Sequence, residues 1–325
     1  MPIQMNAKKT DSALGTLPES MTAGTLKFAQ RLHALLILLV PLFGSIAAFA
    51  MAARGGVDRI EIGSLLGMYL LTMLGISLGF HRYLTHRAFR AGPGTGSLLV
   101  ILGSMAAQGP PIYWATNHRR HHRFSDRDGD PHSPYVKGAQ PLGGLRGLWH
   151  AHIGWTFDHE ITNSLVYGKD LLRDPLLMKI NRLYFVWVFL GFLLPALLGG
   201  LVAGSWAGFC SGFLWGGLVR SFFSYHATAS VNSLTHWFGT VAFQTHDGSR
   251  NNILLALPTL GEAWHNNHHA FPSAAVFGLR WWQVDLGGWV ISLLEKAGWV
   301  WEVKTPTSEN IEARAGGSGN RFADG

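Results

Sequence analysis

The sequence of 325 residues contains a single cysteine. One thiol excludes a disulfide framework and any site built from several cysteine thiolates. Charged residues are also scarce, at 14% of the chain, where soluble globular proteins average about 25%. Among the charged residues, the acidic ones are fewer, with 19 Asp and Glu against 26 Lys and Arg. The formal net charge is therefore +7. With 48% hydrophobic residues, this composition excludes a disordered chain and argues against an ordinary soluble enzyme.

Aromatic residues and glycine, by contrast, are plentiful, with 13 Trp, 19 Phe and 40 Gly. This combination is typical of membrane proteins, where Trp gathers at the interfaces and Gly lets helices approach closely. Crossing a bilayer takes about 20 apolar residues in a helix. Four apolar runs are long enough, at residues 32–53, 60–80, 183–203 and 206–225. Because the first two and the last two are separated by only a few residues, the sequence predicts two helical hairpins.

The remaining segments define the predicted topology. Two hairpins place both termini and the segment between them on one face, and the Lys and Arg of these loops make that face cytoplasmic. Residues 95–115 are apolar as well, but Gln108-Gly109-Pro110-Pro111 leaves too short a helix to cross. We therefore expect an all-α integral membrane domain over 26–304, with a cytoplasmic helical cap formed by 81–182 and 226–304. The polar ends, 1–25 and 305–325, are predicted to be disordered tails.

Sixteen histidines are the most unusual part of the composition, and nine of them form clusters beside the predicted spans. The clusters are His81 and His86 in H-R-Y-L-T-H, His118, His121 and His122 in H-R-R-H-H, His236 in N-S-L-T-H, and His265, His268 and His269 in H-N-N-H-H. Spacings of three and four place the members of each H-x-x-H-H box on one helix face. Neutral imidazoles suit iron, zinc, copper or nickel. Because nine ligands exceed what one ion holds, two metal ions are predicted.

Three functions are compatible with such a site. Transporters place their ligands within the spans, whereas these histidines lie outside them. An imidazole-rich site at the edge of a membrane suits activation of O2 and oxidation of a C–H bond in a lipid chain. A lipid-chain desaturase, a lipid hydroxylase and a non-catalytic metal-binding membrane protein therefore remain open. Since the positive charge lies beside the membrane, we expect no nucleic-acid partner.

The histidine motifs, in their extended form, resemble those of a known enzyme family. H-R-Y-L-T-H-R-x-F, H-R-R-H-H-R-F-S-D, N-S-L-T-H and G-E-A-W-H-N-N-H-H-A-F-P are similar to the integral-membrane fatty acid desaturases of the stearoyl-CoA-like, acyl-CoA Δ9 type. The resemblance runs from the first span to about residue 305. It implies a four-span fold with a di-iron centre in the cytoplasmic cap, which takes O2 and two electrons and introduces a cis double bond into an acyl chain.

The resemblance also assigns residues. It implies iron ligation by His81, His86, His118, His121, His122, His236, His265, His268 and His269, with Asn232 reaching one iron through a water. Hydrogen bonding to these ligands is expected of His132, His152, Asp130 and Glu262, because metal-bound imidazoles need an oriented outer partner. Gln108, Trp114 and Thr228 match the kink of a substrate tunnel, although ordinary packing is an equal alternative for them.

Two departures from the family leave the partners of the reaction open. Ala115-Thr116-Asn117 stands where the animal enzymes carry a charged pair near the CoA headgroup. The acyl chain is therefore expected on CoA, a glycerolipid or a carrier protein. The sequence contains no H-P-G-G haem motif, as in the bacterial form without a cytochrome b5 domain. A separate donor such as ferredoxin, rubredoxin or a cytochrome b5-like protein is expected to supply the electrons.

Overall fold

The computed structural model describes residues 17–21, 24–158 and 160–316 of the chain, which fold into two compact units. Unit 1 comprises Met1–Ile76, Ser97–Asn117 and Thr156–His226, and unit 2 comprises Ser77–Gly96, His118–Trp155 and Ala227–Gly325. The predicted cap is thus divided. Residues 97–117 and 156–182 belong with the predicted spans in unit 1, and the nine clustered histidines all belong to unit 2.

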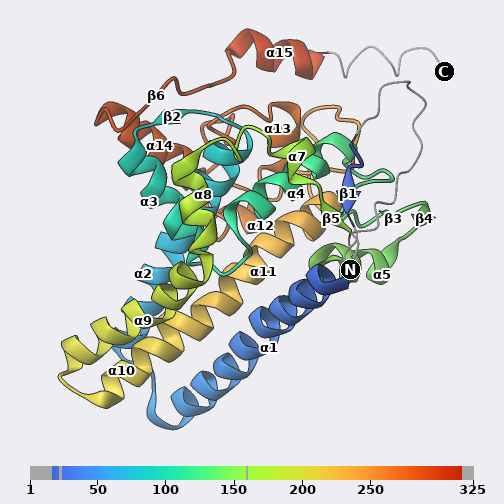
Figure 1. The fold of residues 1–325 in the computed structure, drawn as a ribbon. Helices are drawn as coiled ribbons and strands as arrows, with labels where there is room; N and C mark the ends of the chain where they lie inside the picture. The colour runs from blue at the N-terminus through green and yellow to red at the C-terminus, as the bar shows by residue number, and fades with distance from the viewer. Residues whose placement is uncertain (1–16, 22–23, 159, 317–325) are drawn as a thin grey trace. The chain divides into compact units, whose positions relative to one another are not determined.

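Helices dominate both units, as the all-α prediction requires (Figure 1). Unit 1 holds α1 (Gly24–Gly55), α2 (Arg59–Leu74), α3 (Pro93–Ser104, in large part), α7 (Ser164–Tyr167), α8 (Pro175–Arg182), α9 (Tyr184–Ala203), α10 (Trp206–Gly212) and the π-helix η3 (Phe213–Val219). Unit 2 holds α5 (Gly144–Trp149), the π-helix η2 (His150–Gly154), the 3-10 turn η4 (Leu234–His236), α12 (Ile253–Ala256), α13 (His265–Ala270), α14 (Leu286–Lys296) and α15 (Ser308–Gly316). Residues of both units form the π-helix η1 (Gly75–Thr85), α4 (Pro111–Phe124), α6 (Trp155–Asp158) and α11 (Arg220–Ser233).

The only strands among the described residues are three antiparallel pairs with two residues in each strand. β1 (Ser20–Met21) pairs with β5 (Ile161–Thr162), β2 (Arg90–Ala91) with β6 (Val300–Trp301), and β3 (Val136–Lys137) with β4 (Gln140–Pro141). Such short ladders fasten loops rather than build a layer, and the fold is governed by helix packing.

The long apolar helices of unit 1 pack side by side. α2 and α9 contact each other, and η3 contacts α1, α2 and α9 (Figure 1). Large apolar side chains cover the outer face of α9, where Leu201 is 77% and Phe185 70% exposed. An apolar surface of this extent suits a lipid environment, because water would penalise it. Unit 1 therefore has the surface of a membrane protein.

Three helical segments of the described residues are long and apolar enough to cross a bilayer, namely Lys27–Gly55, Arg59–Thr85 and Tyr184–Ala203. They coincide with three of the four predicted spans. The fourth, residues 206–225, is helical throughout but is divided into α10, η3 and the start of α11. Its α-helical hydrogen bonding is interrupted by the π-helical turn, so no single α-helix of sufficient length forms there. The fourth crossing stays a prediction.

The broken apolar stretch at 95–115 is held in place by hydrogen bonds within unit 1. Its two helical parts, α3 and α4, are separated by residues 105–110. Fully buried Arg220 donates to the carbonyl oxygens of Met105, at 3.0 Å, and Gly191, at 2.9 Å. The hydroxyl of Tyr184 accepts a hydrogen bond from the backbone N–H of Gly109 at 3.0 Å. The break is thus satisfied by partners from α9 and α11, as membrane interiors require.

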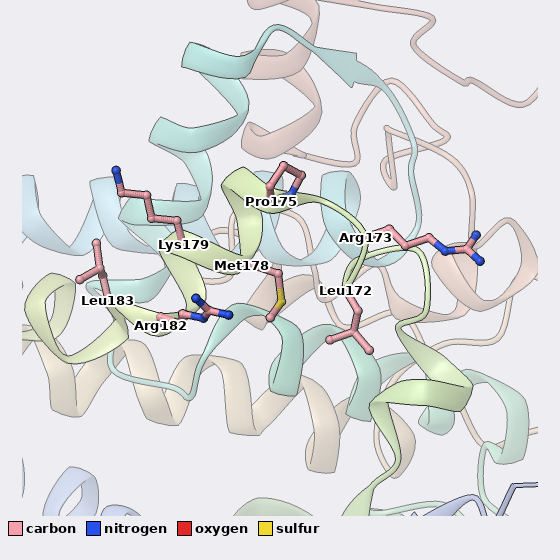
Figure 2. Close-up of a pocket in the computed structure, with 7 residues that line it drawn as sticks. All are labelled: Leu172, Arg173, Pro175, Met178, Lys179, Arg182 and Leu183. Carbon is pink, nitrogen blue, oxygen red and sulfur yellow. The ribbon is translucent and has the colours of Figure 1, made fainter.

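Helix α8 is a short amphipathic helix. Asp174 caps its N-terminus, accepting from the N–H groups of Leu176 and Leu177 at 2.9 and 3.0 Å. A pocket of about 510 Å³ lies beside it, and Figure 2 shows the side chains that line it, three of them cationic. They are Leu172, Arg173, Pro175, Met178, Lys179, Arg182 and Leu183. No histidine lines this pocket, so it is no part of the predicted metal site.

Parts of the predicted tails are ordered in the structure, which differs from the prediction there. Near the N-terminus, Asn163 binds Glu19 and Pro18 through their backbone carbonyls, which fastens β1. Near the C-terminus, the Thr307 hydroxyl caps α15, and Arg314 of α15 donates to the Ala270 carbonyl and lies 4.9 Å from the Phe271 ring. These side chains hold the two segments through hydrogen bonds to backbone groups. The polar composition of the segments gave no indication of these contacts. Residues 1–16 and 317–325 lie outside the described residues.

The close pairing of α9 and α10 yields a test of the fold. A Cβ atom on Gly212 would lie 2.1 Å from the Pro195 carbonyl oxygen, a backbone atom that cannot move aside, whereas one on Gly67 would meet nothing within 4 Å. We expect Gly212→Ala to lower the midpoint of thermal unfolding in detergent, consistent with an overpacking cost of about 1–3 kcal/mol. Gly67→Ala should leave the midpoint unchanged or raise it slightly, because alanine favours a helix more than glycine does. Equal midpoints for the two variants would contradict the close approach.

Candidate metal centre

A π-helical turn places the first two histidines of the site. Residues five apart point to different faces of an α-helix with 3.6 residues per turn. Here the backbone N–H of His86 donates to the His81 carbonyl five residues earlier at 3.1 Å, the bonding pattern of a π-helix. The wider turn brings the two rings onto one side, with centroids 4.8 Å apart. Local helix geometry thus explains how H-R-Y-L-T-H supplies two neighbouring imidazoles.

The two H-x-x-H-H boxes lie on α4 and α13, and each box is divided between two groups of rings. The first group comprises His81, His86, His118, His122 and His268, and the second comprises His121, His236, His265 and His269. In each box the residues four apart stay together, because they lie on one helix face. The histidine between them joins the other group. Each helix therefore contributes a pair to one group and a single ring to the other, which the sequence analysis did not foresee.

Within each group, ring nitrogens converge at short distances. The Nε2 atom of His268 lies 2.9 Å from that of His122 and 3.1 Å from that of His81. The Nε2 atoms of His118 and His122 are 3.0 Å apart. In the second group, the Nε2 atoms of His236 and His265 are also 3.0 Å apart. Within each group one nitrogen atom of every member lies within 4.8 Å of the others.

Burial keeps most of these rings neutral. His81, His121, His236, His265 and His268 are each at most 2% exposed. Burial, and then the charge that neighbouring imidazoles would carry, holds the pKa of His118, His122 and His268 well below its usual value. Burial likewise lowers the pKa of His269 to about 4, although Asp247 acts against it. Neutral imidazole is the form that binds a metal ion.

Carboxylates contact the outer nitrogen of several rings. Glu262 binds Nδ1 of His81, and Asp130 lies 3.0 Å from Nδ1 of His121. Burial alone would raise the pKa of these two carboxyls, but the imidazoles, together with Arg82 beside Glu262, lower the pKa of both below its usual value. Both carboxylates were predicted to act on ligand histidines; the structure shows them against His81 and His121, and their action on metal ligands stays a prediction. A carboxylate on Nδ1 fixes the tautomer and turns the lone pair of Nε2 inward.

Two further carboxylates were missed by the sequence analysis. Asp126 lies 2.8 Å from Nδ1 of His236, and Asp247 lies 2.7 Å from Nδ1 of His269. Burial opposes protonation of His236, but Asp126 outweighs it and raises the pKa of His236. Asp126 closes the motif H-R-R-H-H-R-F-S-D, so its position could have indicated this role. Asp247 lies 22 residues before His269 and carries no such signal.

The remaining residues predicted to lie near the metal, His132, His152 and Asn232, do not place a carboxylate against a ring. His132 stacks on His121 with ring centroids 4.3 Å apart, and its backbone N–H donates to Asp130 at 3.0 Å. His152 contacts the Ser233 hydroxyl at 2.9 Å, on the α11 turn that leads to His236. Asn232, half-buried near the end of α11, precedes His236 by four residues. Its predicted contact with a metal through water stays a prediction.

The three predicted tunnel residues are distributed over both units. Gln108 and Trp114 belong to unit 1, and Thr228 belongs to unit 2. All three are half-buried, and the Gln108 amide donates to the Ser224 carbonyl at 3.2 Å. This contact is compatible with either role of Gln108, and the tunnel assignment of the three residues stays a prediction.

Several buried ring nitrogens have the properties that a metal ion requires of its ligands. The Nε2 atoms of His86, His121 and His269 are buried and have no hydrogen-bond partner among the described residues. Buried polar atoms are normally satisfied. A neutral imidazole has one N–H and one lone pair. Where Nδ1–H faces a carboxylate, the inward Nε2 therefore carries a lone pair and needs a cation or a donor.

Comparison with known proteins identifies the family. A family model described as fatty acid desaturase matches residues 62–301. The chain belongs to the fatty acid desaturase family. It is 47% identical over 316 residues to a hex-5-enoyl-[acyl-carrier protein] acetylenase of Moorena producens (strain JHB), which covers 97% of this chain and 98% of that protein.

Two other relatives are less similar. The chain is 39% identical to an sn-1 stearoyl-lipid 9-desaturase of Anabaena variabilis, over 75% of this chain and 84% of that protein. It is 36% identical to an acyl-CoA 5-desaturase of Anemone leveillei, over 72% of this chain and 68% of that protein. With this family, its clustered histidines and its apolar helices, the chain is a metal-binding membrane enzyme of lipid metabolism. The resemblance inferred from the motifs is confirmed at the level of the family.

The division of the rings predicts the metal content of variants. We expect His118→Ala, which removes a ring from the first group, and His265→Ala, which removes one from the second, each to lower bound metal from two ions to one, because each group would lose a ligand of its own ion. Elemental analysis of the purified protein measures the ratio. His246→Ala, a change to an exposed ring, serves as the control. A variant of either group that retained two ions would contradict the division.

Proposed function

We propose that this protein is an O2-dependent desaturase of acyl chains with two iron ions, one in each histidine group. The observation that carries the proposal is the convergence of nine imidazoles into a group of five and a group of four. An all-imidazole donor set is compatible with iron, and the family to which the chain belongs acts on fatty acyl chains. The nine histidines are the proposed ligands, and Asn232 is proposed to reach one iron through a water.

The metal pair would activate O2, the oxidant for C–H cleavage, which no side chain of this protein can do. The overall reaction takes one O2, two electrons and two protons, removes two hydrogen atoms from adjacent carbons of the chain, and releases two water molecules. The carbon–carbon double bond replaces the two broken C–H bonds. Hydrogens and electrons balance only with an external reductant, so a separate electron-donor protein is part of the proposal.

The residues around the groups have a positioning role. Glu262, Asp130, Asp126 and Asp247 hold the Nδ1–H of four ligands, so that the rings cannot rotate away when charge changes at the metals. His132 supports His121 by stacking. Burial excludes water from the rings, which protects an oxidising centre from reaction with solvent.

Several finer assignments belong to the proposal. We place the metal site and both termini on the cytoplasmic side of a four-span protein, which the Lys and Arg of the loops favour. Gln108, Trp114 and Thr228 are each proposed, from their match to the family motifs, to contact the acyl chain. The double bond is assigned to the Δ9 position, which the quoted motifs favour.

A second activity is favoured by one relative. The acetylenase of Moorena producens matches nearly the whole length of both chains, and its name indicates that it acts on an alkene carried by acyl-carrier protein. Removal of two hydrogens from an alkene yields an alkyne with the same balance of O2, electrons and protons. An unsaturated chain on a carrier protein is therefore the second candidate substrate, beside saturated chains on glycerolipid or CoA.

Expression in a host without its own desaturase tests the activity. We expect new monounsaturated acyl chains in the total lipid profile by mass spectrometry, with the double bond located by derivatisation. Feeding a terminal or internal alkene acid should yield an alkyne if the second candidate is right. The variant His118→Ala/His265→Ala, which removes a ring from each group, should form no product.

The other outcomes are distinct. Hydroxylated chains would identify a hydroxylase of the same plan, and an unchanged profile with two bound metal ions would identify a non-catalytic metal-binding protein. Assays of the purified protein with acyl-CoA, acyl-carrier protein and glycerolipid, each with ferredoxin or rubredoxin as the donor, then identify the acyl carrier. Either of the two distinct outcomes would overturn the desaturase proposal.

A further inference from the structure

The pocket of about 510 Å³ beside α8 combines three cations with four apolar side chains. The cations are Arg173, Lys179 and Arg182. In Figure 2, Met178 and Leu172 lie near the middle of the pocket, with Lys179 and Arg182 to one side and Arg173 to the other. The pocket thus presents positive charge at its edges and an apolar surface between them.

The three cations have no acidic partner within the described ranges, 17–21, 24–158 and 160–316. All three side chains are exposed, and none forms a hydrogen bond or an ion pair with another described residue. Asp174, which lies in the same segment, accepts instead from the N–H groups of Leu176 and Leu177 at 2.9 and 3.0 Å. The positive charge of this surface is therefore available to a ligand.

The opposite face of α8 is buried and fixes the direction of the cationic face. Leu177 and Ile180 are each 5% exposed. The ring N–H of Trp187, in the first turns of α9, donates to the Ile180 carbonyl at 3.1 Å. Because α8 is held by its apolar face, Lys179 and Arg182 stay on the outer face of unit 1.

The pocket lies next to the start of a lipid-compatible surface. α8 ends at Arg182, and α9, one of the three segments long and apolar enough to cross a bilayer, begins at Tyr184. Phe185 and Val186, in the first turn of α9, are 70% and 46% exposed. Lipid headgroups lie at the ends of a spanning helix, because the hydrocarbon core ends there. The cations that precede α9 are therefore expected to lie beside headgroups.

We propose that this pocket binds one anionic phospholipid, with its phosphate beside Lys179 and Arg182 and an acyl chain beside Met178 and Leu183. Guanidinium and ammonium groups bind phosphate through charge-assisted hydrogen bonds. A soluble phosphate compound would use the charges but would leave the four apolar side chains of the pocket without a partner. Binding of this lipid needs no metal ion and is separate from the proposed desaturase activity.

Native mass spectrometry of the full chain in detergent, titrated with phosphatidylglycerol or phosphatidylcholine, tests the site. We expect one phosphatidylglycerol to bind in preference to phosphatidylcholine. Lys179→Gln/Arg182→Gln should weaken the binding of phosphatidylglycerol about 25-fold, because each basic residue near a membrane surface contributes about fivefold. The control Arg54→Gln/Arg59→Gln removes two exposed cations on either side of the turn between α1 and α2, and it should leave the binding unchanged.

Two results of this titration would overturn the proposal. An equal loss of binding in both double variants would indicate general attraction between cations and anionic lipid, without a site at α8. Equal binding of the two lipids to the wild-type protein would show that the cations do not select a negative headgroup.

A charge-preserving variant keeps the test decisive if the neutral variant folds poorly. Lys179→Arg/Arg182→Lys retains both charges and should retain the preference for phosphatidylglycerol. Loss of the preference in this variant, with an unchanged midpoint of thermal unfolding, would contradict recognition by charge.

Competition with coenzyme A distinguishes a lipid from a soluble phosphate compound. We expect coenzyme A at 0.1 mM, on the order of a typical cofactor concentration, to leave the bound phosphatidylglycerol in place. Displacement of the lipid, together with binding of coenzyme A that Lys179→Gln/Arg182→Gln abolishes, would assign the pocket to a soluble acyl carrier and overturn the lipid proposal. The proposed desaturase activity would stand in either case, because the acyl-chain profile tests it separately.

Discussion

Nine imidazole rings of unit 2 each bring one ring nitrogen close to those of their group, and several Nε2 atoms lie about 3 Å apart. Such a cluster gives up hydration without gaining a full set of hydrogen bonds, which is costly for buried polar atoms. A cation at each group would accept the converging lone pairs and offset the free energy lost on dehydration of the rings. The helices of unit 2 are short and the strands shorter. If the two groups bind metal as proposed, we expect metal binding and folding of this unit to be coupled, as they are in small metal-bound folds.

Carboxylates beside the rings connect the two histidine groups with other segments of unit 2. Glu262 links the five-histidine group to Arg82, and Arg82 continues to Asp285, which caps α14 by accepting from the Gly288 N–H at 2.8 Å. Asp126 links the four-histidine group to the loop at Gly248. Asp126 thus orients a ring and also satisfies the backbone of a neighbouring segment, whereas Glu262 orients a ring and binds Arg82. A polar network of this kind is stable only when every member is paired.

The sequence predicted a large part of this arrangement, and its limits have physical causes. Histidine spacings of three and four residues identified the two H-x-x-H-H boxes, because the periodicity of a helix can be recognised from local sequence alone. Three apolar runs became helices of spanning length for the same reason. The π-turn that brings His86 beside His81 is not encoded in any periodicity, since it depends on the packing of the whole helix. Asp247 was invisible because its contact with His269 is made by the tertiary fold. The prediction of a disordered tail over 305–325 was wrong for residues 308–316, where the Thr307 cap and the Arg314 contact hold a helix that a polar composition does not indicate.

The exchange of rings between α4 and α13 has a consequence for how such a sequence can change. Each helix serves both groups, so neither can rotate or slide without disturbing ligands on both sides at once. Insertion of one residue between His118 and His121 would destroy the four-residue spacing of the pair and turn the single ring away from its group. Length variation is therefore excluded within the boxes, whereas the loops between them are free of this restriction. Because each of the two helices supplies rings to both groups, the spacing of the histidines within each box is expected to stay fixed when the rest of the sequence changes.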